Sequence, residues 1–143
     1  MKSALEGVRI LDFTWAWAGP FGTTLLALMG AEVIKVESSS RLDHSRLRSM
    51  AAGPVACDKN ESPPFNCINL GKLSIRLSFK KLEAIELVKK LVKHCDAVTQ
   101  NFRPGVLDKL GLGYESLKAV KPDIILVSSS ALGSSGPEKS YIG

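Results

Sequence analysis

An apolar run, a Gly-Pro pair and a second apolar run follow one another near the start of the chain, and this order constrains the fold most. Residues 8–13 form a compact apolar segment that predicts a buried strand. Pro20 suits the first turn of a helix, where its missing N–H costs nothing, and Gly30 suits the end of that helix. Residues 31–36 predict a second strand, so the whole stretch has the size of one βαβ unit. The loop after the first strand is where such sheets bind ligands.

Strand and helix patterns continue to alternate along the rest of the chain. Between residues 37 and 70 the pattern dissolves into Ser, Gly and Pro, including Gly53-Pro54 and Pro63-Pro64, and such long excursions tend to be functional or mobile. Beyond it, strands are predicted at 73–79, 97–100 and 124–128, and helices at 81–95, 106–110 and 114–120. This alternation predicts an α/β fold, a mainly parallel open sheet with helices on both faces, in one domain that spans residues 1–143.

Composition excludes several classes of function. The net charge of +5 favours anionic partners, but the basic residues are dispersed and no nucleic-acid motif accompanies them. No apolar run approaches the roughly 20 residues of a membrane span, and the N-terminus lacks a secretory signal. The three scattered cysteines, Cys57, Cys67 and Cys95, predict reduced thiols and a cytoplasmic location. His44 has no partner at ligand spacing, so no metal site is expected.

Asp12 and His94 are candidates for catalysis, but both suit a structural interpretation better. Asp12 ends a strand just before a threonine, where a turn or capping role is typical. His94 falls in the last turn of the helix predicted at 81–95, where a partial positive charge suits the helix dipole.

Four stretches in order resemble the family III CoA-transferases of the CaiB/BaiF type, a group that includes formyl-CoA transferase, carnitine CoA-transferase and the methylacyl-CoA racemases. They are LEGVRILDFT at 5–14, Ala18-Gly19-Pro20 followed by GAEVIKVE at 30–37, NFRPG at 101–105, and LGLGY at 110–114. The resemblance runs from about residue 5 to the end of the chain. It implies a Rossmann-like, CoA-binding N-terminal portion, and interlocked dimers, so a homodimer or higher oligomer is expected.

The resemblance also implies which residues contact CoA or acyl-CoA as the substrate. Carried onto this sequence, these positions are Trp15, Ala16, Trp17, Ala18, Leu77, Ser78, Phe79, Lys80, Asn101, Phe102, Arg103 and Lys109. Three of them are cations suited to phosphate, and Phe102 and Trp17 are flat surfaces suited to adenine. From the residues alone the two tryptophans fit a core role equally well, and the lysines fit an ordinary solvated surface.

Two departures from the family pattern bear on the chemistry. Many relatives carry a basic residue where this chain has Ser38, so one phosphate contact is either absent or supplied by Arg41. In the transferases an aspartate attacks the acyl-CoA thioester to form an acyl-enzyme anhydride. The resemblance places that aspartate beyond Gly143, so no catalytic residue is expected within this chain, which alone should be inactive.

Three functions therefore stay open. The first is the N-terminal portion of an acyl-CoA transferase that moves CoA from an acyl-CoA to a carboxylic acid. The second is a non-catalytic module that binds CoA or a nucleotide, or serves assembly. The third is a fragment of an α-methylacyl-CoA racemase, whose histidine would directly follow the glycine matched by Gly143.

Overall fold

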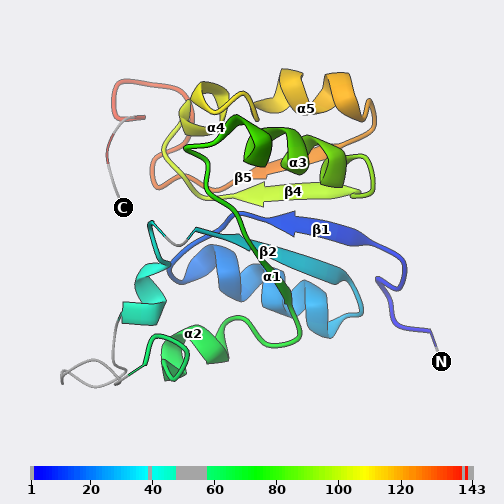
Figure 1. Cartoon of the computed structure of the whole chain (residues 1–143), viewed down its shortest axis with the longest axis vertical. Coiled ribbons are helices and arrows are strands. Elements are labelled where there is room, and N and C mark those ends of the chain that lie inside the picture. The colour runs from blue at the N-terminus through cyan, green and yellow to red at the C-terminus, as the bar shows by residue number, and fades with distance from the viewer. Residues whose placement is uncertain (1, 39, 48–57, 140, 142–143) are drawn as a thin grey trace.

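A five-stranded, wholly parallel sheet forms the centre of the molecule, with strand order β3-β2-β1-β4-β5 (Figure 1). The computed structural model describes residues 2–38, 40–47, 58–139 and 141. In chain order its elements are β1 Arg9–Asp12, α1 Ala18–Leu28, β2 Glu32–Glu37, η1 His44–Leu47, α2 Pro63–Cys67, β3 Leu73–Arg76, α3 Leu82–Val92, β4 Ala97–Gln100, α4 Val106–Lys109, α5 Tyr114–Val120 and β5 Ile125–Ser128. This order is that of the first five strands of a Rossmann-type sheet, and it confirms the predicted α/β class.

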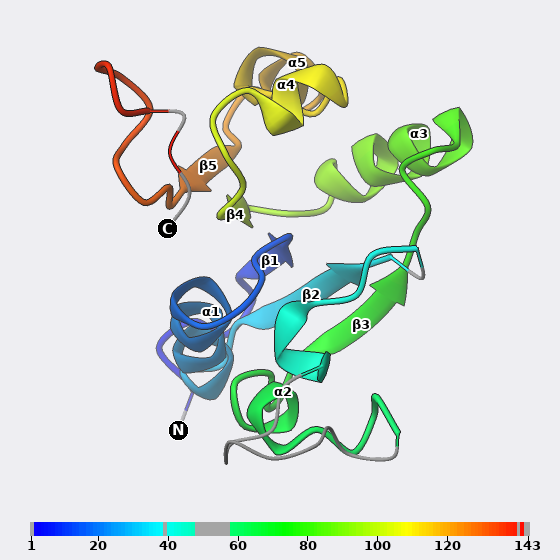
Figure 2. The same ribbon diagram turned by 90° about the vertical axis from the view of Figure 1, so that its left-hand side faces the viewer.

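Helices cover both faces of the sheet, as predicted. On one face Ile10 and Val33 pack with Leu26 of α1, while on the other Leu11 and Val98 belong to a larger cluster to which α3 and α5 contribute. Figure 2 shows α1 and α3 on opposite sides of the strands. Because neighbouring side chains of a strand point to opposite faces, the centre of β1 places Ile10 on one face and Leu11 on the other, and both are buried.

The helix α3 follows its predicted periodicity but is shorter at both ends than residues 81–95. Its buried side chains are Ala84, Ile85, Val88 and Val92. His94 lies beyond Val92, so its predicted place in the last helical turn is wrong. Its backbone carbonyl instead accepts a hydrogen bond from the Arg9 guanidinium at 3.2 Å.

The excursion between β2 and β3 contains two short elements that the sequence did not predict, η1 and α2. In the sequence, Pro63 and Pro64 indicate a break between regular elements. In the structure they occupy the first turn of α2, where proline is favoured. The side chains of Phe65, in α2, and of Ile68, which follows it, are buried. Gly53-Pro54 and Cys57, interpreted above, lie outside the described residues, as does Gly143.

Candidate functional site

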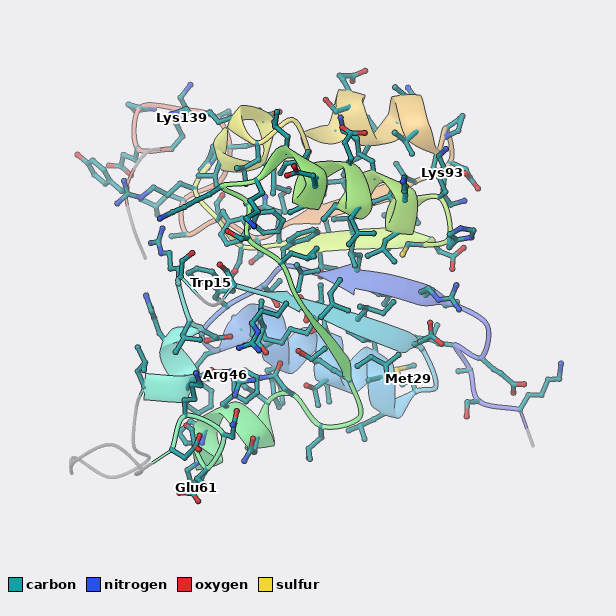
Figure 3. The ribbon with its side chains drawn as sticks, viewed as in Figure 1. Trp15, Met29, Arg46, Glu61, Lys93 and Lys139 are labelled. Carbon is teal, nitrogen blue, oxygen red and sulfur yellow. The ribbon has the colours of Figure 1, made fainter. Side chains whose placement is uncertain are left out.

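The loops after β1 and β4 meet at the carboxyl ends of the central strands, where the chain turns to opposite faces of the sheet. The Trp15 N–H donates to Asn101 Oδ1 at 2.8 Å, and Asn101 Nδ2 donates to the Trp15 carbonyl at 2.7 Å. The Phe102 ring lies edge-on to Trp15, with 5.5 Å between ring centroids. In Figure 3, Trp15 lies on the side toward which β1 and β4 run, opposite Met29 and Lys93. Two of the predicted site stretches are thus joined directly, 86 residues apart in sequence.

The third predicted stretch, residues 77–80, follows β3 at the same edge of the sheet, with β2 between it and the central loops. The Leu77 and Phe79 side chains are half-buried against the core, and the Phe79 ring lies 5.9 Å from that of Phe13. Phe79 therefore packs against Phe13, the first residue after β1. Lys80 and, on α4, Lys109 are exposed.

Positive charge gathers at this edge without acidic partners. Five cationic side chains there are exposed, and within the described ranges none of them forms a salt bridge: Arg41, Arg76, Lys80, Arg103 and Lys109. Among the acidic groups of the same region, Glu37 is paired with Arg46 and Asp43 with Lys35, while Asp108, beside Lys109, forms no salt bridge within the described residues. The edge consequently presents a positive surface to an anionic ligand.

The segment after β2 folds back over Trp15. A bridge between Ser38 and Arg41 turns the chain, and the Arg41 guanidinium lies 5.2 Å from the centroid of the Trp15 ring. The His44 ring lies 6.1 Å from the same ring. Arg41, the predicted substitute for a basic residue at position 38, therefore lies within the candidate site.

The loop after β1 has one unusual backbone conformation, at Ala16. Its φ of 65° is the only positive value among the described non-glycine residues. Such a left-handed conformation costs an L-residue about 1–2 kcal/mol. The Ala16 N–H donates to Asp43 Oδ1 at 3.0 Å, and a bond to an ionised acceptor contributes about 1.5–3 kcal/mol, enough to offset the strain.

Asp43 is itself held by a buried lysine. Lys35 Nζ lies 3.0 Å from Asp43 Oδ2, and the two side chains are 1% and 0% exposed. Burial alone would raise the pKa of Asp43, but the charge of Lys35 and the N–H bonds from Ser45 and Ala16 outweigh it and lower that pKa. The carboxylate is therefore ionised at neutral pH.

Asp12 organises the base of the same loop, which confirms its interpretation as a turn residue. Its Oδ1 accepts bonds from the Thr14 N–H at 2.9 Å and the Thr99 hydroxyl at 3.0 Å. Its Oδ2 accepts bonds from the Thr23 hydroxyl at 2.6 Å and Lys72 Nζ at 3.1 Å. Burial lowers the pKa of Lys72, and the charge of Asp12 only partly counters this effect. Sequence reasoning missed both lysine pairs, because no local pattern marks ion pairs between a strand and a loop.

The helix α1 begins close against this loop. A Cβ added at Gly19 would lie 2.5 Å from the Thr14 Cβ, so only glycine allows this approach. The first N–H groups of a helix have no acceptor within it, and those of Ala18 and Gly19 lie at the edge where the cations gather.

An open groove of about 290 Å³ adjoins the site between β4, β5 and α4. Phe102, Arg103, Tyr114 and Ser128 are among its lining residues.

The described residues contain no cluster of three groups that would hold a metal ion. Within the same residues, none of the helices has the length and apolar character needed to traverse a bilayer.

The sequence is similar to that of known CoA-transferases along nearly its whole length. A family model described as CoA-transferase family III matches residues 5–143. An acyl-CoA transferase of Fusarium pseudograminearum (strain CS3096) is 39% identical over 145 residues, which cover 99% of this chain and 32% of that protein. A succinyl-CoA:glutarate CoA-transferase of Mus musculus is 42% identical over 133 residues, which cover 93% and 29%.

A solved structure supports the same relationship. The crystal structure of a CaiB/BaiF family protein from Brucella suis superposes with a TM-score of 0.85 at 36% identity, over 100% of this chain and 37% of that one. The chain thus spans about a third of the length of the relatives it matches.

Proposed function

Since this chain belongs to CoA-transferase family III, we propose that its carboxyl sheet edge binds the CoA portion of an acyl-CoA. The observation that carries the proposal is the joined pair of loops around Trp15 and Asn101, with exposed cations that form no salt bridge at the same edge of the sheet. The residues assigned to CoA are those inferred from the sequence, with Arg41 added.

Charge supports the binding of the CoA phosphates. Arg103 and Lys109 come from the loop and helix after β4, and Arg41 comes from the segment after β2. Arginine binds phosphate as a planar fork and lysine binds it as a point charge. Cations on two sides of Trp15 suit a ligand with several phosphate groups.

Flat side chains support the binding of adenine. Trp17 is 52% exposed, so its ring is free to stack. Phe102 is half-buried against Trp15 and lines the groove between β4 and β5. A purine and a pantetheine chain both favour such partly apolar surfaces next to charge.

For the whole protein we propose transfer of CoA from an acyl-CoA to a carboxylic acid. The names of the relatives, which include a succinyl-CoA:glutarate CoA-transferase, favour this chemistry over racemisation. No residue of this chain is assigned as nucleophile, so a transferase assay with succinyl-CoA and a panel of carboxylic acids is expected to show no turnover by residues 1–143. The non-catalytic binding module is the alternative that this assay leaves in place.

We place the protein in the cytoplasm, on the strength of its scattered cysteines, and assign it no metal. A homodimer or higher oligomer would cover the apolar side chains that α1 exposes, including Phe21 at 53% and Leu28 at 67%.

Calorimetric titration with CoA tests the binding site. We expect micromolar affinity for the wild type, and about tenfold weaker binding for Arg103→Ala and for Lys109→Ala, because each loses a charge-assisted bond to phosphate. Lys93→Ala is the matched control, an exposed cation at the opposite edge of the sheet, and it should leave the Kd unchanged. Absence of binding by the wild type, or equal weakening by Lys93→Ala, would show that this edge is not the CoA site.

A further inference from the structure

Lys35 and Asp43 form a buried pair whose contacts converge on the loop between β1 and α1. We infer that Asp43, oriented by Lys35, is a positioning residue that fixes the left-handed backbone at Ala16 and thereby sets how Trp15 and the start of α1 face the ligand. The ligand part of this inference rests on the proposed function, whereas the loop part stands without it.

The contacts of the pair lie on both sides of Trp15. Asp43 Oδ1 accepts the Ala16 N–H at 3.0 Å, and Lys35 Nζ donates to the Thr14 carbonyl at 2.8 Å. The carboxylate is kept in place by two further bonds to Oδ1, from the Ser45 N–H at 2.9 Å and the Ser45 hydroxyl at 2.8 Å. Both backbone groups that flank the tryptophan are therefore bound by one ion pair.

The strained backbone needs such a partner. Ala16 has a φ of 65°, which alanine adopts only when its surroundings hold it there. Trp17, the next residue, makes no side-chain hydrogen bond that caps the start of α1. The Asp43 carboxylate therefore holds Ala16, while Asn101 holds the neighbouring Trp15.

The pair is better explained by positioning than by stability alone. Two buried charges contribute little net stability, because the desolvation of both groups offsets their attraction. The Glu37–Arg46 pair of the same segment provides a comparison. Its guanidinium bonds reach Lys59 and Asn60, and none reaches the loop after β1.

The test uses the chain's own fluorescence, because its two tryptophans are Trp15 and Trp17. Lys35→Met combined with Asp43→Leu removes both charges together, so no buried charge is left without a partner, and it also removes the oxygen that accepts the Ala16 N–H. We expect this double variant to keep its circular dichroism, with a melting temperature lowered by the loss of the bonds from Ala16 and Ser45. Its tryptophan emission should shift to the red and be quenched more readily by acrylamide, and its Kd for CoA should rise about tenfold.

Ala16→Gly in that background separates positioning from general damage. Glycine adopts a positive φ without strain, so this change should restore most of the emission spectrum and of the CoA affinity. The matched control combines Glu37→Gln with Arg46→Met, which removes an ion pair of the same segment. It should leave the emission and the Kd unchanged.

Three results would overturn the inference: unchanged emission in the folded double variant, no rescue by Ala16→Gly, or the same emission change in the control. If the double variant fails to fold, amide hydrogen exchange in the wild type decides, since the Ala16 N–H must be protected and the Ala18 N–H unprotected. If the wild type does not bind CoA, the proposed function fails, while the fluorescence and exchange results still decide the role of Asp43.

Discussion

Trp15 shows how a residue's role depends on contacts that its own stretch of sequence does not specify. Its position just after a buried strand predicted a place in the loop, but left core packing and ligand contact equally open. Its bonds to Asn101 follow from the pairing of β1 with β4. Its contact with Arg41 depends on the turn after β2, which no periodicity in the sequence reveals.

Cys67 and Cys95 are expected to differ in reactivity, because tertiary packing buries only one of them. Cys95 is buried, and burial raises the pKa of its thiol to about 11. Cys67 is exposed. Iodoacetamide at neutral pH should therefore label Cys67 and spare Cys95 in the native protein, with both labelled in concentrated urea. Peptide mass spectrometry measures each site, and native labelling of Cys95 at the rate of Cys67 would contradict the burial described.

The same shift has a consequence for stability. The folded state keeps the Cys95 proton to about pH 11, whereas an ordinary thiol with a pKa of 9.0 has lost it. The unfolded state thus binds fewer protons between these values, so the free energy of unfolding falls as the pH rises through this window.

At the scale of elements, the sequence predicted the helices and strands whose buried residues recur at the regular spacing of a helix or a strand. The strand β4 and the helix α5 lie at their predicted residues, and α3 differs only at its ends. The helix α2 could not be predicted because it is a single short turn that begins with two prolines, and tertiary contacts rather than amphipathicity stabilise it. One such contact is the bond from the Thr24 hydroxyl to the Ile68 carbonyl.

The junction between β1 and α1 offers a test with an internal control, because α1 contains two glycines. Gly19→Ala should lower the free energy of unfolding by about 1–3 kcal/mol, since the new methyl group would overlap Thr14. Gly22 has open space around it, and Gly22→Ala should raise that free energy by up to about 1 kcal/mol through helix propensity. Urea unfolding measures both changes. Equal effects of the two substitutions would mean that α1 does not approach the loop as described.

At the scale of the whole molecule, the sequence predicted the sheet and its two covered faces, and the edge at which the candidate residues come together. It predicted them because strand–helix alternation and the rule for ligand position follow from local patterns. The two buried lysine pairs were not predictable, since Lys35 and Lys72 resemble ordinary surface lysines until the strands assemble. The central claim is that the carboxyl sheet edge forms the CoA surface.

Hydrogen exchange of the backbone amides, with and without CoA, tests that claim most directly. CoA is expected to slow exchange in residues 13–18, 40–46 and 101–105, the loops that lie at the carboxyl ends of β1, β2 and β4. Exchange in residues 29–31, 93–96 and 121–124, at the opposite edge, should not change. Protection confined to the opposite edge, or no protection anywhere at a saturating CoA concentration, would contradict the account.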